Sequence, residues 1–321
     1  MIERFPKVSV MVVTYNQEDL ISDTIESVLA QDYPNFEIVV SDDASTDGTA
    51  NVIRDYETRF PGVVRGVYNK INLGITGNSN TAFFACEGEL IALLGGDDLF
   101  LPGKLSAQVA LFEDPEVTIS YHGVDVFVHQ TGEVLFTTNT TENEQVRDVY
   151  DLIAKGGIPG ASSIMVRRSA CPAHGFHPDF PAVTDWIFSI EVALKGKVQE
   201  LHGVYGKYRK HGLGASERTF ELLDESLKTL SVVSAAHPTN KKLQETCMKG
   251  GYRYLLGELY RQVVKGNAEK VVALKKYFRN YSVGFKRILT LAVLDLLSQK
   301  WVLSFVSTSL PKIKNLIKRN I

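Results

Sequence analysis

The sequence predicts an α/β fold, in which a mixed and mainly parallel sheet is flanked by helices and followed by a C-terminal helical extension. Short apolar runs rich in β-branched residues alternate with amphipathic segments over the first hundred residues. Strand patterns cease near residue 217, and only helical periodicity follows. Of the 321 residues, 44% are hydrophobic and 22% are charged, as in ordinary globular proteins. We therefore expect an α/β domain over residues 1–215 and a helical extension over residues 216–321.

The first elements follow the alternation of a parallel sheet. Residues 7–13 are apolar on both faces, as a buried parallel strand is, and residues 20–29 then show helical spacing of apolar side chains. A second apolar strand covers residues 36–40. The polar stretch 41–48 that ends it is rich in helix-capping residues, which predicts another helix through about residue 56. The next elements are strands at 63–68 and 89–94 and a helix at 78–86.

The middle of the chain predicts antiparallel pairing. Strands at 117–128 and 133–137 are joined by a short turn at 130–132, which is typical of a hairpin. The later elements are strands at 161–167 and 198–205 and a helix at 182–194. The sheet is therefore expected to be mixed.

The extension is expected to be helical and basic at its end. Its helices are predicted at 218–235, 240–264, 268–279 and 285–308. Residues 286–321 carry seven basic side chains against one acidic, a net charge of +6, whereas the remainder carries 28 against 36, a net charge of −8. Peripheral docking of residues 285–321 on an anionic lipid surface and a helical homo-oligomer interface both fit this pattern. A membrane span is disfavoured, since Asp295 and Lys300 would each cost about 2.5–3.5 kcal/mol near its centre.

Charge and cysteine content narrow the class of protein. The overall net charge of −2 produces no positive electrostatic field that would attract nucleic acid, so no nucleic-acid partner is expected. The three cysteines lie far apart and form no disulfide framework, which fits a reducing compartment. No signal peptide is expected in the first residues. We therefore predict a cytoplasmic location, with peripheral attachment to the inner face of the cytoplasmic membrane left open.

Three polar clusters follow predicted strands at their carboxyl ends, where open α/β sheets bind ligands. They are Thr14-Tyr15-Asn16, Asp42-Asp43 and Gly95-Gly96-Asp97-Asp98. Asp42 and Asp43 could instead cap a helix or form a turn, although capping alone does not require two adjacent, mutually repelling carboxylates. Because parallel strands end at one edge, we expect the three clusters to meet there.

Asp97 and Asp98 are the strongest candidates for binding a metal ion. They follow an apolar strand and two glycines, and paired carboxylates are hard oxygen donors suited to Mg²⁺ or Mn²⁺. The alternative is a turn with a helix cap. No G-x-G-x-x-G, phosphate-binding loop, G-x-S-x-G or H-E-x-x-H motif is present, which disfavours dinucleotide enzymes, serine hydrolases and zinc proteases.

These motifs together resemble the family-2 glycosyltransferases of the GT-A fold. The resemblance lies in VSVMVVTYNQEDLISDTIESVLAQDYPNFEIVVSDDASTDGTANVI and LIALLGGDDLFLPGKLSAQV; it is strong over residues 7–113 and weaker to about 215. It implies an inverting transferase that takes a sugar from a nucleoside-diphosphate-sugar, a UDP-sugar in particular, to a hydroxyl acceptor with the help of Mg²⁺ or Mn²⁺. It also implies a glycan or lipid-linked acceptor in bacterial surface polysaccharide synthesis.

The resemblance assigns a donor site. It places the donor nucleoside against Thr14, Tyr15, Asn16, Asp42 and Asp43, and Asn80 at a position that often contacts the donor, although Asn80 could equally cap a helix. The family's D-x-D motif maps onto Asp97 and Asp98, which implies a donor contact for Asp97 and metal binding for one or both. The first acid of that motif is replaced by Gly95 or Gly96, so the sequence does not decide which aspartate binds the metal.

The resemblance also assigns the base and a closing segment. Asp185, at the start of a later helix, is the implied catalytic base, and Trp186 beside it lies in the acceptor pocket or in the core. In YGKYRKHGLGAS, His211 is an implied metal ligand and Arg209 a donor contact, and Gly212 and Gly214 suggest a loop that orders over the donor. Two other classes stay open: a non-catalytic nucleotide-sugar or glycan-binding protein, and a nucleotidyltransferase.

Overall fold

The computed structural model describes residues 5–211 and 219–319. It divides into two compact units, one of Met1–Leu152 and Gly157–Arg218, the other of Ile153–Gly156 and Thr219–Ile321. The domain boundary predicted at residue 215 lies among residues 212–218, outside the described part of the chain.

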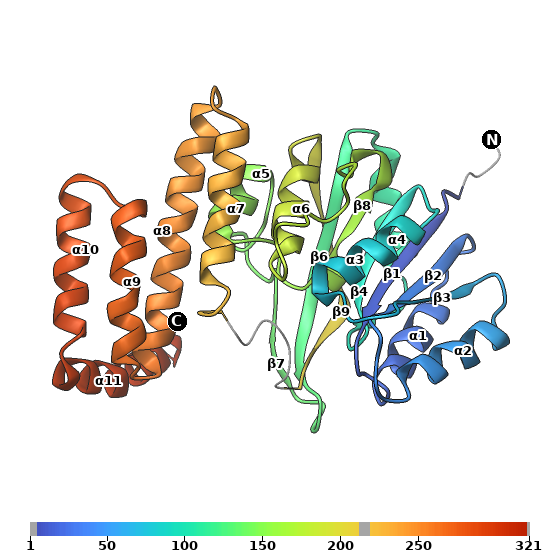
Figure 1. Ribbon diagram of the computed structural model, residues 1–321, viewed down its shortest axis with the longest axis horizontal. Helices are drawn as coiled ribbons and strands as arrows, with labels where there is room; N and C mark the ends of the chain where they lie inside the picture. The colour runs from blue at the N-terminus through green and yellow to red at the C-terminus, as the bar shows by residue number, and fades with distance from the viewer. Residues whose placement is uncertain (1–4, 212–218, 320–321) are drawn as a thin grey trace. The chain divides into compact units, whose positions relative to one another are not determined.

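The first unit is built on one nine-stranded sheet with the strand order β3-β2-β1-β4-β8-β6-β9-β5, and β7 pairs with β6 (Figure 1). Strands β1 to β4 pair in parallel, as does β6 with β9, whereas β5, β7 and β8 pair antiparallel. The predicted mixed, mainly parallel sheet is therefore confirmed. The strands are β1 (Val8–Thr14), β2 (Phe36–Asp42), β3 (Val64–Tyr68), β4 (Leu90–Gly95), β5 (Leu99–Phe100), β6 (Val117–Val128), β7 (Val134–Thr137), β8 (Met165–Arg167) and β9 (Lys197–Lys210).

Helices cover both faces of this sheet. Val8, Val10 and Val12 of β1 share one apolar cluster with Ile21 and Ile25 of α1. On the other face, Ser41 of β2 donates to Asn78 of α3. Burial on both sides explains why these strands are apolar throughout. The helices of the first unit are α1 (Ile21–Leu29), α2 (Thr49–Arg59), α3 (Gly74–Ala85), α4 (Lys104–Ala110) and α6 (Thr184–Ala193), and α5 (Val149–Lys155) crosses from one unit to the other.

The strand register aligns the ends of the three central strands. Thr14 at the end of β1 pairs with Asp42 at the end of β2, and Val13 pairs with Gly95 at the end of β4. The three polar clusters therefore meet at one edge of the sheet, as the sequence predicts.

The second unit is helical. Its helices are α7 (Leu223–Ala236), α8 (Lys241–Val264), α9 (Ala268–Tyr281), α10 (Gly284–Leu297) and α11 (Lys300–Arg319). Asn240 and Asn267 cap α8 and α9, because each accepts a hydrogen bond from the backbone N–H three residues later. Leu255, Phe278 and Leu294 belong to the apolar core between the helices.

Four elements differ from the sequence prediction. The strand predicted over 161–167 is only β8, Met165–Arg167, because residues 161–163 form a turn of 3-10 helix. The helix predicted over 285–308 is two helices, α10 and α11, bent by 94° at a break after Leu297. The strand predicted to end at residue 205 continues as β9 to Lys210, where it pairs with the distant strand β6. The helix predicted at 78–86 begins at Gly74, because Asp43 accepts hydrogen bonds from the backbone N–H groups of Leu73 and Gly74.

Candidate active site

Two adjoining cavities open at the edge of the sheet where the polar clusters meet. The first has a volume of about 770 Å³ and the second about 500 Å³. Val13, Ile75 and Asp97 line both of them. The residues from the sequence prediction that line the first are Thr14, Tyr15, Asn16, Asp43, Asp97 and His211, and those that line the second are Asp97, Asp98 and Asp185. The fold therefore gathers most of the predicted site residues in one place.

The loop after β1 forms one wall of the first cavity. Asn16 has a left-handed backbone conformation, with φ of 52°. Its side-chain oxygen accepts a hydrogen bond from the backbone of Thr46 at 2.8 Å, and its backbone donates to Ser45 Oγ at 2.8 Å. These contacts tie the loop after β1 to the loop after β2. The Tyr15 ring stays about half exposed and lines the cavity, so it can stack on a planar ligand.

The aspartates after β2 have different surroundings. Both oxygens of Asp42 accept hydrogen bonds from Ser45, and Asp42 lines neither cavity. Asp43 accepts from the backbone of Leu73 at 2.8 Å and of Gly74 at 2.9 Å, and from Asn69 Nδ2 at 3.0 Å. Asp43 therefore both caps helix α3 and lines the first cavity.

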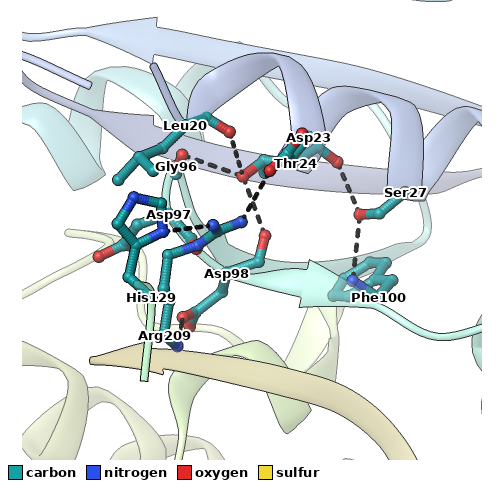
Figure 2. A network of polar contacts seen from close by, with 10 residues as sticks. All are labelled: Leu20, Asp23, Thr24, Ser27, Gly96, Asp97, Asp98, Phe100, His129 and Arg209. Carbon is teal, nitrogen blue, oxygen red and sulfur yellow. Dashed lines mark hydrogen bonds and ion pairs between the residues drawn. The ribbon is translucent and has the colours of Figure 1, made fainter. Parts of the chain in front are cut away.

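Helix α1 fixes the turn that carries the second pair of aspartates. Thr24 donates to the carbonyl oxygens of Gly96 and Asp98, each at 2.9 Å. Ser27 accepts from the backbone of Phe100 at 3.1 Å (Figure 2). A buried threonine and a serine on one helix thus hold both ends of the turn.

Arg209 of β9 braces the same turn from the other side. Its guanidinium donates to the carbonyl oxygen of Asp97 at 2.7 Å, lies 3.1 Å from the carboxylate of Asp23 and contacts His129 Nδ1 at 2.9 Å (Figure 2). The side chain is buried and lines neither cavity. These contacts hold the turn in position; the donor contact suggested by the sequence stays a prediction.

Asp97 and Asp98, the two aspartates of this turn, differ in burial and in the groups that they contact. Asp98 is only 3% exposed and accepts a hydrogen bond from the backbone of Arg209 at 3.0 Å. Burial, reinforced by the neighbouring charge of Asp97, raises the pKa of the Asp98 carboxyl above its ordinary value. Asp97 is partly exposed, faces both cavities and places Oδ2 2.8 Å from His211 Nε2. Of the pair, Asp97 is the carboxylate that a ligand can reach from both sides.

The glycines before Asp97 show which position could hold the missing acid. A Cβ at Gly96 would lie 2.7 Å from Thr14 Cβ and would also strike the Gln17 side chain, so β1 would have to move. A Cβ at Gly95 would lie 2.7 Å from Asp97 Oδ1, the movable end of a side chain. Position 95 is therefore the one that could carry an acid, and the Asp97 carboxylate uses that space here.

Asp97 and His211 form a donor set that fits a divalent cation. A carboxylate oxygen and an imidazole nitrogen are both ligands of Mn²⁺, and the two atoms already converge at 2.8 Å. Among the described residues, no group of three or more His, Cys, Asp or Glu is arranged to hold a metal. Water or a bound molecule with oxygen donors can supply further ligands. Gly212 and Gly214, proposed from sequence as part of a closing loop, lie outside the described residues.

Asp185 stands on the wall of the second cavity. It is in the first turn of α6, where a carboxylate is stabilised by the helix dipole, and its Oδ1 accepts from the backbone of Trp186 at 2.9 Å. Its side chain is exposed towards solvent. Trp186 is only 5% exposed and lines neither cavity, which is the core position that the sequence left open.

Asn80 lies outside both cavities. Its side chain forms two hydrogen bonds with the backbone of Phe176: Nδ2 donates to the carbonyl oxygen at 2.8 Å, and Oδ1 accepts from the N–H at 2.8 Å. Asn78, two residues earlier on the same helix, lines the first cavity and donates to the carbonyl oxygens of Thr14 and Ser41. A shift of two residues turns a helical side chain by about 200°, so Asn78 and Asn80 point in nearly opposite directions, and the donor contact suggested for Asn80 stays a prediction.

Some lining residues carried no sequence signal of a functional role. His129 and Gln130 lie in the loop between β6 and β7 and reach the first cavity, and Lys210 lines the second. The backbone of His129 donates to the carbonyl oxygen of Lys210 at 3.0 Å. The sequence predicted a turn at 130–132, and the structure has the loop there. The sequence did not predict that this loop reaches the cavity, because that depends on the pairing of β6 with the distant strand β9.

Comparison with solved structures defines the class of fold. The structure is similar to that of S. aureus TarS in complex with UDP-GlcNAc, with a TM-score of 0.65 and 17% identity over 86% of this chain and 82% of that one. It is also similar to the mannosyltransferase PcManGT from Pyrobaculum calidifontis in complex with GDP-Man and Mn²⁺, with a TM-score of 0.60 and 17% identity over 95% and 88% of the two chains. The fold is the GT-A fold, with helices added at the C-terminus.

The family follows from the sequence comparison. The chain belongs to glycosyl transferase family 2, whose model matches residues 9–171. It is 28% identical, over 72% of its length and 88% of the relative's, to the Escherichia coli UDP-Glc:alpha-D-GlcNAc-diphosphoundecaprenol beta-1,3-glucosyltransferase WfaP. An uncharacterised protein of Mycobacterium tuberculosis is 30% identical over 64% of this chain, and the match spans only 59% of that relative's length.

Proposed function

We propose that this protein transfers a sugar, with inversion, from a nucleoside-diphosphate-sugar to a hydroxyl group of a glycan or lipid-linked acceptor. The observation that carries the proposal is the position of Asp97, which lines two cavities at once. One cavity holds an aromatic ring and a carboxylate suited to a nucleoside, and the other holds Asp185. A donor that spans both would place its anomeric carbon between the diphosphate and a carboxylate base.

The first cavity suits the nucleoside. Tyr15 offers an exposed ring face for the base, and Asp43 offers carboxylate oxygens that accept from a ring N–H such as that of uracil. Asn16 fixes the shape of this wall through its contacts with the next loop. We infer a UDP-sugar as the donor because two similar proteins, the E. coli transferase and TarS, are named with UDP-sugars. PcManGT holds GDP-Man, so GDP-sugars belong in the test.

Asp97 and His211 would hold a divalent cation, Mg²⁺ or Mn²⁺. When bound, such an ion stabilises negative charge on a departing diphosphate. The chain's own part is to hold Asp97 in place, through Thr24 on one side of the turn and Arg209 on the other. Asp98 is buried beneath and accepts from the backbone of β9, so it supports the turn without facing the first cavity.

Asp185 is the proposed base. It is exposed, lines the same cavity as Asp97 and sits on the rigid start of a helix. As the acceptor hydroxyl attacks the anomeric carbon, Asp185 takes its proton while the bond to the nucleoside diphosphate breaks. A single displacement of this kind inverts the anomeric configuration. No covalent link between sugar and protein is required.

The experiment that tests this function compares Asp185→Asn with the intact protein. Donor binding is measured first, by calorimetry with UDP-, GDP- and dTDP-sugars and Mn²⁺, and nucleoside-diphosphate release is measured next with the donor that binds. We expect Asp185→Asn to bind the donor as tightly as the intact protein but to turn over about 10²–10⁴ times more slowly. Asp179→Asn, at an exposed acid outside both cavities, serves as the matched control and should leave turnover unchanged.

The outcomes separate the open classes. Near-normal turnover by Asp185→Asn would remove the proposed base. Donor binding without turnover in the intact protein would favour a binding protein, and release of pyrophosphate would favour a nucleotidyltransferase. The anomeric configuration of the product, read by NMR early in the reaction, tests inversion separately, since retention would contradict a single displacement.

A further inference from the structure

The last two helices of the second unit carry an exposed apolar surface. Among the described residues, 21 large apolar side chains are exposed, and eight of them lie between Val283 and Phe305. We call this set the α10–α11 apolar surface; it consists of Val283, Phe285, Ile288, Leu289, Val293, Leu296, Trp301 and Phe305. Phe285 is 78% exposed, Trp301 72% and Phe305 70%. A patch of this kind on a surface marks an interaction site.

Helix α10 is apolar on two opposite faces. Leu294 is buried in the helical core, and Leu291 and Leu297 on the same side pack against that core. Phe285, Ile288, Leu289, Val293 and Leu296 recur at helical spacing on the opposite, exposed face. The inward face accounts for the packing of the helix in its unit. The outward face has no such role, so another partner must account for it.

Helix α11 continues the same pattern. Val302 and Leu303 are buried, whereas Trp301 and Phe305, one helical turn apart, are exposed. Tryptophan and phenylalanine are side chains that anchor helices lying in the boundary between lipid headgroups and acyl chains. The two helices thus expose aromatic rings beside aliphatic ones.

The charge around this surface is positive. Residues 284–319 carry seven basic side chains and a single acid, Asp295, which pairs with Lys275 of α9. Lys286 and Arg287 belong to α10 and Lys300 begins α11, and the sequence of α11 adds Lys312, Lys314, Lys318 and Arg319. An apolar surface on a segment with a net charge of +6 in sequence is complementary to a membrane rich in anionic lipid, whereas a surface for a second copy of the same chain would bring two segments of like charge together.

The bend between α10 and α11 interrupts the apolar segment. No single helix among the described residues is long and apolar enough to cross a bilayer. Helix α10 and residues 300–309 of α11 reach the length and hydropathy of a span only when taken together, and they are bent by 94° relative to each other. A pair bent at nearly a right angle offers no continuous span of the hydrocarbon layer. We therefore propose that the α10–α11 apolar surface docks this protein on the face of an anionic membrane, with the rings inserted and the basic side chains on the headgroups.

The test uses the full chain and vesicles of equal parts phosphatidylglycerol and phosphatidylcholine, compared with phosphatidylcholine alone. We expect flotation with the anionic vesicles and at least tenfold weaker binding to the neutral ones. Trp301 also gives a direct readout, because the protein has two tryptophans and the other, Trp186, is already buried. Its fluorescence emission should shift to shorter wavelength on the anionic vesicles, and Trp301→Phe should abolish the shift.

Two sets of substitutions test the two contributions to binding, the insertion of aromatic rings and the attraction of basic residues to anionic lipid. Trp301→Ser with Phe305→Ser should weaken binding more than about tenfold, since two buried rings are lost. Lys312→Gln with Lys314→Gln and Lys318→Gln should weaken it about a hundredfold, at about fivefold for each charge near an anionic surface. Ile71→Ser with Leu135→Ser is the matched control, because these exposed apolar residues lie in the other unit, and it should bind normally.

Three results would overturn the proposal. The first is equal binding to neutral and anionic vesicles, or none to either. The second is protein that resists extraction from the vesicles by alkaline carbonate, which indicates a span. The third is a lipid-free dimer in sedimentation equilibrium that Trp301→Ser with Phe305→Ser dissociates, which assigns the surface to a second copy. None of these measurements uses turnover, so the proposal stands or fails separately from the proposed transferase activity.

Discussion

Two pairs of adjacent aspartates stand at the ends of parallel strands, Asp42–Asp43 at β2 and Asp97–Asp98 at β4, with β1 between them. In the first pair the leading residue, Asp42, is engaged in a local turn and the following one lines a cavity. In the second pair the order is reversed, since Asp97 faces both cavities and Asp98 supports the backbone. In the first Asp-Asp pair, therefore, the second residue is the one that a ligand can reach, whereas in the second pair it is the first residue.

The difference has a physical origin. Asp43 is directed at the N-terminus of α3, whose backbone N–H groups it caps. Asp98 is directed instead at the backbone of Arg209, 111 residues away in sequence. In each case the partner that supplies backbone donors fixes one carboxylate. A carboxylate pair at a strand end therefore indicates a site, but its tertiary neighbours decide which member faces the ligand.

The largest expected effect concerns the second pair. Asp97→Asn removes the charge of the reachable carboxylate, so nucleoside-diphosphate release at saturating donor and Mn²⁺ should fall about 10²–10³-fold. Asp98→Asn keeps the acceptor for the Arg209 N–H and removes a charge that burial already disfavours, so its loss should stay below about tenfold. Thermal unfolding checks that both variants fold. A larger loss in Asp98→Asn than in Asp97→Asn would reverse the assignment.

The next effect concerns the helix that follows the second pair. Lys104, the first residue of α4, is fully buried with Nζ 4.0 Å from the centre of the Phe100 ring, and no described residue accepts a hydrogen bond from it. Burial lowers the pKa of Lys104 to about 7. The unfolded chain therefore binds more protons than the folded one between pH 7 and the ordinary lysine pKa of about 10.4, and the free energy of unfolding rises with pH over that range.

Lys104→Met should remove this slope. It should also raise the free energy of unfolding by about 4 kcal/mol at pH 7 and by about 2 kcal/mol at pH 9, because the cost of releasing the lysine proton on folding falls as the pH approaches the ordinary lysine pKa. Urea denaturation followed by circular dichroism at the two pH values measures both effects. Lys70→Met, at an exposed lysine, is the control and should change neither value. An unchanged slope in Lys104→Met would show that the folded protein accommodates the charge without cost.

The smallest effect concerns the first pair. Asp43→Asn replaces one acceptor oxygen by a donor and leaves a backbone N–H of the α3 cap unpaired, which should cost about 2 kcal/mol of stability and raise the KM for the donor about tenfold. Asp42→Asn keeps one of its two contacts with Ser45 and should cost about 1 kcal/mol without changing that KM. Steady-state rates at varied donor concentration and thermal unfolding distinguish the two. An equal rise in KM for both variants would contradict the division within this pair.

Sequence reasoning succeeded where local pattern and sheet geometry suffice. The apolar runs and the register of parallel strands bring Thr14, Asp42 and Gly95 to one edge, and this follows from strand order alone. It could not separate Asp97 from Asp98, because the distinction depends on Arg209 from a strand more than a hundred residues later. It joined α10 and α11 into one helix, since their composition is continuous across the break. Nor did the sequence indicate Asn78 as a lining residue of the first cavity, two positions before the predicted Asn80.

The glycine at position 95 couples any substitution at this position to Asp97. The Asp97 carboxylate lies where the first atom of a side chain at position 95 would sit, with Oδ1 2.7 Å from that point. An acid introduced there alone would push Asp97 away from His211 before it gained any contact of its own. Positions 95 and 97 are therefore coupled, and we expect an acid introduced at position 95 alone to lower activity by displacing the Asp97 carboxylate.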